Sequence, residues 1–275
     1  MTAPLLAVDG DSFAHRAYHG IPKTIRRANG RPGGALSGFT NMLLRLWADE
    51  RPASVLVGWD TLGSPTYRNV EFPPYQSGRE FDDDLVEQLE LLPQVVRALG
   101  LGCAKAVGYE ADDFLAAAAA STDRPVLVAT SDRDAYQLAS DRVTVLQPVS
   151  GGGAPARIGP AEVRERYAVE PAQVPDFIAL RGDPSDKLPG ARGIGTKRAA
   201  EVLAQYGSLE GALEAGRFPA EADALRLYRR LALLDPAAPL PVPLPEGPPR
   251  FAEGAAFVRE LGLNGLADRI EALAV

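Results

Sequence analysis

The stretch Leu5-Leu6-Ala7-Val8-Asp9, near the start of the chain, is a short apolar run that ends in an acid. We expect residues 5–8 to form a buried parallel strand. Comparable runs of strand-forming residues follow, with helical stretches between them, at 54–58, 126–130 and 143–146. This alternation predicts an α/β fold, in which helices cover both faces of a mostly parallel central sheet.

Further segments predict the rest of the architecture. Helical composition and length are found at 38–49, 84–99 and 111–120. Three glycines, 151–153, indicate a turn, so the strand at 143–146 and the residues after it are expected to form a hairpin-like edge. After residue 159 we expect short helices with early prolines, at 160–167, 171–180, 195–206 and 208–214.

The chain ends with a proline-rich, irregular connection over 235–250 and a last helix or helix pair over 253–273. We therefore expect two domains. An α/β core would cover residues 1–158, and an all-helical C-terminal domain would cover 159–275.

Composition narrows the class of protein. Of 275 residues, 46% are hydrophobic and 24% charged, which is ordinary for a globular protein. No apolar stretch is long enough to span a bilayer and no basic leader precedes Asp9, so we expect a cytoplasmic protein without a membrane partner. The lone Cys103 excludes an internal disulfide, and His15 and His19, expected at the surface, are too few for a zinc centre.

Acidic residues follow each of the first three predicted strands: Asp9, Asp60, and Asp132 with Asp134. In an open α/β sheet, groups just beyond the carboxyl ends of the strands converge on one crevice. A single aspartate of this kind is usually a helix N-cap. The repetition at three strands favours a shared site.

Two more acidic groups join this set. Glu110, Asp112 and Asp113 begin a predicted helix, where three acids in four residues repel one another unless a cation neutralises them. Asp183 and Asp186 lie on a Gly/Pro turn. Oxygen-only ligand sets select Mg²⁺ or Mn²⁺. Nine acids exceed the needs of one ion, so we expect two ions, about 3.5–4 Å apart as is usual in phosphoryl chemistry.

The net charge of −7 seems to oppose a nucleic-acid partner. With nine carboxylates assigned to metal, however, the rest of the chain carries about +2. Gly193-Ile194-Gly195 precedes a predicted helix, and such glycines let backbone N–H groups approach a phosphate. Lys197 and Arg198 follow in the first turn, which is unfavourable for the helix dipole unless they contact phosphate. A helix-hairpin-helix at about 177–214 would bind duplex backbone without reading bases.

With these motifs the chain resembles the 5′ nucleases of the flap endonuclease superfamily, above all the 5′→3′ exonuclease domain of bacterial DNA polymerase I and its free-standing relatives. The resemblance rests on Val8-Asp9-Gly10, Glu110-Ala111-Asp112-Asp113, Ser131-Asp132-Arg133-Asp134, Gly182-Asp183-Pro184-Ser185-Asp186 and Leu188-Pro189-Gly190 through Lys197. It implies a PIN-like core with a helix-hairpin-helix module. It also implies a structure-specific 5′→3′ exonuclease and flap endonuclease, which acts in DNA replication and repair and leaves 5′-phosphate products.

The resemblance also implies roles for individual acids. The first ion would lie among Asp60, Glu110, Asp112, Asp113 and Asp132, with Asp9 close by as a ligand of bound water. The second ion would lie among Asp134, Asp183 and Asp186. A potassium ion on backbone carbonyls would help the hairpin from Gly193 to Lys197 to grip the duplex.

Residues 61–92 would form a helical arch for the single-stranded 5′ end. Arg68 and Arg79 would act in catalysis by steering the scissile phosphate, and Tyr75 would stack on a base. The implied DNA contacts are Arg16, Tyr18, Tyr75, Gln76, Lys187, Gly193, Gly195, Lys197 and Arg198. Two of these depart from the family pattern, since Gln76 replaces a usual lysine and Lys187 a commoner asparagine.

The expected partner is DNA with a 5′ end, flap or branch, together with a separate DNA polymerase, and we expect a free-standing monomer. Three alternatives remain open. An aspartyl-phosphate phosphatase would use Asp9 as nucleophile and Asp11 as general acid. A DNA-junction binding protein of the same fold would have weakened or lost catalysis, and a small RNA-cutting domain would share the sheet topology.

Overall fold

A computed structural model describes residues 2–22, 24–149, 151 and 153–274. Within these ranges six strands form one sheet in the order β3-β2-β1-β4-β5-β6. The strands are β1 (Leu5–Asp9), β2 (Ser54–Gly58), β3 (Gly102–Ala104), β4 (Val126–Ala129), β5 (Val143–Gln147) and β6 (Ala156–Ile158). β6 pairs antiparallel with β5, and all other pairs are parallel. The predicted α/β fold and its hairpin-like edge are therefore confirmed, while Gly152 of the predicted turn lies outside the described residues.

Alternation along β1 divides the core into two layers. Leu6 and Val8 join a cluster on one face of the sheet, and Leu5 and Ala7 join a cluster on the other. The first face is covered by α1 (Gly10–Gly20), α2 (Gly34–Glu50) and α4 (Asp83–Ala98), whereas α5 (Ala111–Ala120) covers the second. Helices on both faces explain why every residue of β1, β2 and β4 is buried.

The turn from β1 into α1 fixes the direction of the first acid. Asp9 caps α1, because its Oδ1 accepts a hydrogen bond from the Ser12 amide at 2.9 Å. Only glycine fits at position 10, where a Cβ would lie 2.5 Å from the Trp59 ring. Neither α1 nor β3 was predicted from the sequence, since the three residues of β3 are too few for a periodic signal.

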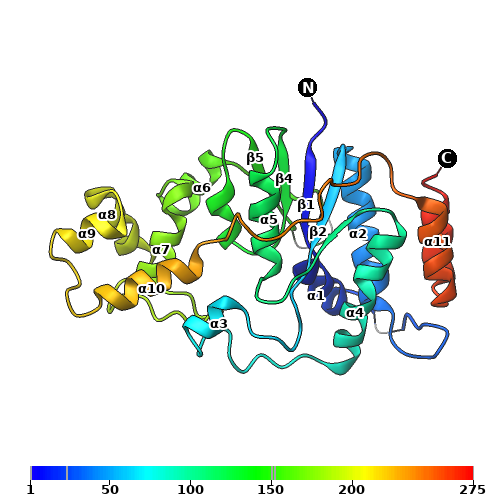
Figure 1. Cartoon of the computed structure of the whole chain (residues 1–275), viewed down its shortest axis with the longest axis horizontal. Helices are drawn as coiled ribbons and strands as arrows, with labels where there is room; N and C mark the ends of the chain where they lie inside the picture. The colour runs from blue at the N-terminus through cyan, green and yellow to red at the C-terminus, as the bar shows by residue number, and fades with distance from the viewer. Residues whose placement is uncertain (1, 23, 150, 152, 275) are drawn as a thin grey trace.

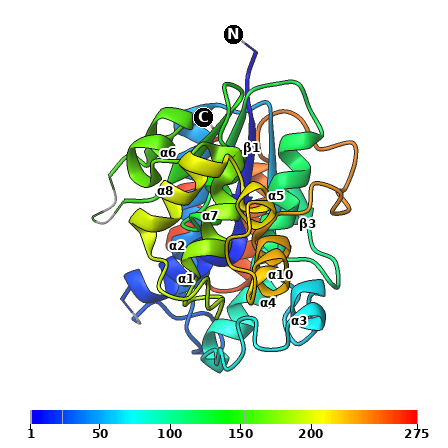
Figure 2. The ribbon, with the colours of Figure 1, turned by 90° about the vertical axis from the view of Figure 1, so that its left-hand side faces the viewer.

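A helical module follows the sheet and lies at the left in Figure 1 and toward the viewer in Figure 2. Its elements are α6 (Pro160–Tyr167), the 3₁₀ turn η2 (Pro171–Gln173), α7 (Val174–Arg181), α8 (Thr196–Tyr206), α9 (Leu209–Glu214) and α10 (Ala222–Ala232). Buried Asp176 joins three of these helices, since it accepts hydrogen bonds from the Leu209 amide and the Arg229 guanidinium. Of these elements, α10 was not predicted from the sequence.

The last two helices, α11 (Phe251–Glu260) and α12 (Asn264–Glu271), leave this module and pack on the α/β core beside α4 (Figure 1). The Phe251 ring lies 5.3 Å from that of Trp47. The irregular connection before them passes the amino end of β2, where the Gly247 amide donates to the Ala53 carbonyl at 3.0 Å. Residues 159–275 therefore do not pack as one helical domain. An apolar stripe on a helix predicts that one face is buried, but it does not specify the surface against which that face packs.

Among the described residues, no helix combines the length and the apolar composition needed to cross a bilayer.

Candidate metal centre and nucleic-acid interface

A cavity of about 1100 Å³ opens at the carboxyl edge of the parallel strands. The register of the sheet brings its acids together, because Asp9 pairs with Gly58 and the acids after β2 and β4 follow at the same edge. Six acids line the cavity: Asp9, Asp11, Asp60, Glu110, Asp112 and Asp132. The predicted convergence of the acids at the strand ends is thus present.

Fixed donors orient these carboxylates. Asp9 also accepts a hydrogen bond from the Thr130 hydroxyl at 2.7 Å. The Ala111 amide, at the start of α5, donates to Asp60 Oδ1 at 2.7 Å, and the Asp134 amide donates to Asp132 Oδ1 at 2.9 Å. The backbone therefore holds the acids in place without a cation.

A second acidic group, made up of Asp134, Asp183 and Asp186, adjoins the acids that line the cavity. The charges of Asp132, Asp186 and Asp183 act on Asp134, whose pKa is raised well above its usual value, chiefly by burial. Arg181 Nη2 donates to Asp183 Oδ2 at 2.9 Å, and the Asp186 side chain is only 10% exposed. The acids of the loop after α7 therefore interact electrostatically with those that follow the sheet strands.

Burial and mutual repulsion disfavour the charged forms of these acids. Burial raises the pKa of Asp9 to about 7, with further contributions from Asp60 and Asp132. It raises the pKa of Glu110 to about 7 and that of Asp186 to about 6. The pKa of Asp112 lies well above its usual value, first through burial and then through neighbouring carboxylates. The free chain thus holds protons where a cation would otherwise balance the charge.

The donor set fits a hard divalent cation. Its ligands are oxygen atoms alone, and Asp112 Oδ1 is buried without a hydrogen-bond partner in the described chain. Over the same residues, no three His, Cys, Asp or Glu side chains already converge on a point where one ion could be held. The carboxylates would therefore have to turn toward an entering cation.

Asp11 is an acid of this cavity that the metal assignment did not include. Its Oδ2 accepts a hydrogen bond from the Asp60 amide at 2.7 Å, and burial raises its pKa well above the usual value. Its position two residues after a strand-end acid was the available signal. His15 also lines the cavity, with its ring 5.1 Å from that of Phe81, so it is half-buried there and does not lie on the open surface as expected.

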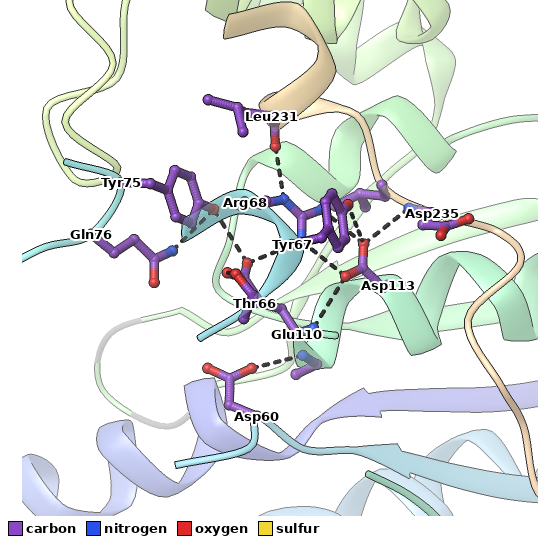
Figure 3. A network of polar contacts seen from close by, with 12 residues as sticks. Asp60, Thr66, Tyr67, Arg68, Tyr75, Gln76, Glu110, Asp113, Leu231 and Asp235 are labelled. Carbon is purple, nitrogen blue, oxygen red and sulfur yellow. Dashed lines mark hydrogen bonds and ion pairs between the residues drawn. The ribbon is translucent and has the colours of Figure 1, made fainter. Parts of the chain in front are cut away.

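Arg68 and Asp113 pair with each other and do not take the positions predicted for them (Figure 3). The guanidinium of Arg68, on α3 (Tyr67–Glu71), donates to both Asp113 oxygens at 2.7 and 2.9 Å, and its Nε donates to the Leu231 carbonyl at 2.8 Å. These side chains are 1% and 0% exposed. Asp113 is thus paired with an arginine and does not line the cavity, and Arg68 is too enclosed to steer a phosphate. The acidic motif alone could not reveal this distant partner.

Two predicted aromatic DNA contacts are also buried. Tyr75 is 4% exposed, and its hydroxyl donates to Glu110 Oε2 at 3.2 Å, so its ring offers no face to a base. Tyr18 is 7% exposed and donates to the Asp82 carboxylate. Arg16 lines the cavity and donates to the Val149 carbonyl. Base contact was predicted wrongly because an aromatic ring within a polar segment can pack in the core as well as against a ligand.

The predicted hairpin is exposed. Gly193 has φ +74, which favours glycine, and open space surrounds the Cβ direction of both Gly193 and Gly195. The Lys197 side chain is 91% exposed, and Arg198 Nη1 donates to the Gly193 carbonyl at 2.9 Å. Lys187 is exposed as well. This part of the module therefore exposes backbone and basic groups to solvent.

The sheet topology and the cavity define a class of α/β proteins in which an acidic crevice lies beyond the carboxyl ends of parallel strands. Residues 4–168 match the family model of the 5′-3′ exonuclease N-terminal resolvase-like domain, and residues 169–250 match that of the 5′-3′ exonuclease C-terminal SAM fold. The chain belongs to the 5′-3′ exonuclease family.

Individual relatives agree with this assignment. The 5′-3′ exonuclease of Streptomyces coelicolor is 34% identical over 295 residues, covering 96% of this chain and 98% of that protein. DNA polymerase I of Mycobacterium bovis is 40% identical over 215 residues, which are 76% of this chain and 24% of the polymerase. The chain thus spans about a quarter of the polymerase's length. The flap endonuclease of bacteriophage T5, solved as a pseudo-enzyme-product complex with DNA and metal ions, shares the fold with a TM-score of 0.68 at 19% identity, covering 98% of this chain and 99% of its own.

Proposed function

We propose that this protein is a metal-dependent 5′→3′ exonuclease and flap endonuclease that hydrolyses phosphodiester bonds near 5′ ends of DNA. The observation that carries the proposal is the acid-lined cavity at the sheet edge, on a chain whose helical module exposes a basic turn. The Streptomyces relative is named a 5′-3′ exonuclease, and the phage structure holds DNA and metal ions. We place its role in DNA replication and repair, as a cytoplasmic monomer working beside a separate DNA polymerase.

Two divalent cations, Mg²⁺ or Mn²⁺, would activate water and neutralise charge on the phosphodiester oxygens when bound. Asp60, Glu110, Asp112 and Asp132 would hold the first, with Asp9 orienting bound water. Asp134, Asp183 and Asp186 would hold the second. We reassign Asp113 to support: it accepts a hydrogen bond from the Glu110 amide at 3.1 Å and thus orients that acid.

The chain's own groups would bring DNA to these acids. Arg79 lines the cavity with a side chain 42% exposed, so its guanidinium can meet a phosphate in the way predicted for it. The half-buried ring of His15 and the exposed ring of Phe81 line the same cavity. The turn from Gly193 to Arg198 would bind duplex backbone, with a potassium ion on its carbonyls as part of the proposal. Release of a 3′ hydroxyl would leave a 5′ phosphate on the product.

The direct test is cleavage of a 5′-flap duplex labelled at either end, with Mg²⁺, Mn²⁺ or EDTA, followed by mapping of product ends. We expect 5′-phosphate products with either metal and none with EDTA. Asp132→Asn should lose most of the activity and keep or increase DNA affinity, because acid–phosphate repulsion falls. Asp123→Asn is a matched control at an exposed aspartate that does not line the cavity.

Two outcomes would overturn the proposal. Tight binding of flap DNA without cleavage at any enzyme concentration would establish a junction-binding protein. Normal cleavage by Asp132→Asn would show that the acids of this cavity are not the metal centre.

A further inference from the structure

The segment between α3 and α4 is docked on the loop that carries the second acidic group. Lys187 Nζ donates to Ser77 Oγ at 3.1 Å, and Arg79 Nη2 donates to the Ser185 carbonyl at 3.3 Å. Gln76 and Lys187 both have left-handed backbone conformations, with φ of 48° and 57°. Such conformations are unusual for residues other than glycine, so the surrounding contacts must hold them in place.

The side-chain amide of Gln76 lies at the centre of this contact. Its Oε1 accepts a hydrogen bond from Arg79 Nη1 at 2.6 Å. Its Nε2 donates to Asp186 Oδ1 at 2.8 Å and to the Tyr75 hydroxyl at 3.1 Å, the latter contact being visible in Figure 3. An amide can accept and donate at once, whereas a lysine ammonium has donors only. The residue that departs from the family pattern therefore makes a bridge that a lysine could not make.

Arg79 is held against an acid as a result. Its Nη2 lies 3.3 Å from Asp186 Oδ1, the same oxygen that accepts from Gln76. Asp186 Oδ1 thus already has two donors in the free chain. A cation that takes this oxygen must displace them, and a displaced Arg79 would still be tethered to Gln76 through Oε1.

We propose that Gln76 is a positioning residue for Arg79. It holds the guanidinium at the cavity wall beside Asp186, from where the guanidinium passes to a DNA phosphate as a cation takes over the carboxylate. The inference rests on the proposed function and extends it in two ways. Gln76 acts on cleavage through Arg79, and the pair Gln76–Arg79 competes with a divalent cation for Asp186.

A double-mutant cycle tests the first part. We would measure single-turnover cleavage of a 5′-flap duplex by wild type, Gln76→Met, Arg79→Ala and the double variant. Gln76→Met keeps the length of the side chain without its hydrogen bonds. The matched control is Gln94→Ala on α4, where an exposed amide donates to the Glu90 carbonyl of the same helix.

We expect Arg79→Ala to slow cleavage by about 10- to 100-fold and Gln76→Met by about tenfold at saturating DNA, with little change in KM. In the Arg79→Ala background, Gln76→Met should have almost no further effect, because the two act as one unit. A Gln76 effect of the same size with and without Arg79, or wild-type cleavage by Gln76→Met, would overturn the proposal.

The second part has a readout without DNA or activity. Mn²⁺ titration by calorimetry should show tighter binding to Gln76→Met and to Arg79→Ala than to wild type or Gln94→Ala, because each change removes a competing donor from Asp186. Unchanged Mn²⁺ affinity in both variants would overturn this competition. If wild type fails to cut flap DNA, the proposed function fails while the Mn²⁺ comparison still decides the competition. If wild type cuts and the cycle is additive, only the role of Gln76 fails.

Discussion

Replacing Arg68 by methionine separates a structural from a catalytic role for this residue. The guanidinium makes two hydrogen bonds to Asp113, one to the Leu231 carbonyl and one to the Leu233 carbonyl at 3.2 Å, and its Nη1 lies 3.3 Å from Glu110 Oε2. Methionine fills much of the space but pairs with none of these groups. Asp113, fully buried, would be left without its counter-charge.

The expected loss follows from that burial. Removing one partner of a buried ion pair costs about 3–5 kcal/mol, since the remaining charge is desolvated and unpaired. A protein of this kind has a total stability of about 5–15 kcal/mol. At about 2–4 °C per kcal/mol, the melting temperature should fall by roughly 10 °C. Adding Asp113→Asn to Arg68→Met should recover part of the loss, because the uncompensated charge disappears.

Urea unfolding followed by far-UV circular dichroism measures the change. The matched control is Arg230→Met on α10, which removes an exposed pair with Glu71 at 3.3 Å and should shift the free energy of unfolding by less than about 0.5 kcal/mol. If Arg68→Met unfolds at the same urea concentration as wild type while cleavage collapses, Arg68 contacts the substrate and its structural assignment is wrong.

Three further predictions concern charge. Asp112→Asn should raise the melting temperature in EDTA by a few degrees and abolish stabilisation by Mg²⁺, because it removes a buried carboxyl group that must take up a proton when the chain folds and whose Oδ1 has no partner; an unchanged Mg²⁺ response in a thermal scan would contradict this. In EDTA, the free energy of unfolding should fall as the pH rises from about 4 to about 7. In that window Asp9 and Glu110, each with a pKa raised to about 7, keep protons in the folded chain that the unfolded chain has lost. Mg²⁺ should therefore stabilise more at pH 8 than at pH 5, and urea titrations showing a flat or rising profile would count against the raised values. Lys197→Ala should weaken duplex binding severalfold and reduce its salt slope by about one, without changing the melting temperature, since its side chain is 91% exposed; fluorescence anisotropy at several salt concentrations checks it, and an unchanged slope would exclude a phosphate contact.

The parallel strands and the convergence of their terminal acids could be predicted because both follow from short-range patterns. β1 is an apolar run that ends in Asp9, and Asp60 and Asp132 follow β2 and β4 within three residues. The roles of Arg68 and Asp113 could not be predicted in the same way. Their pairing depends on carbonyl groups at the carboxyl end of α10, which no local pattern connects to α3 or α5.

Other differences have a similar origin. Tyr75 lies in a polar segment, as a base-stacking residue would, yet its hydroxyl is used to orient Glu110. The last two helices were predicted from their apolar stripes, but only the surface around Trp47 and Leu99 decided where they pack. Sequence patterns thus placed the acids, and tertiary packing decided which of them face the cavity.

The return of α11 and α12 to the α/β core means that the helical module is an insertion with two covalent anchors and not a pendant at the end of the chain. One connection leaves the sheet after β6, and the other returns past the amino end of β2 at Gly247 and the end of α4 at Arg250. These two connections, together with the hydrogen bonds from Arg68 to the Leu231 and Leu233 carbonyls, fix the module against the core. A duplex bound at the turn from Gly193 to Arg198 would accordingly lie at a fixed distance from the acids of the cavity.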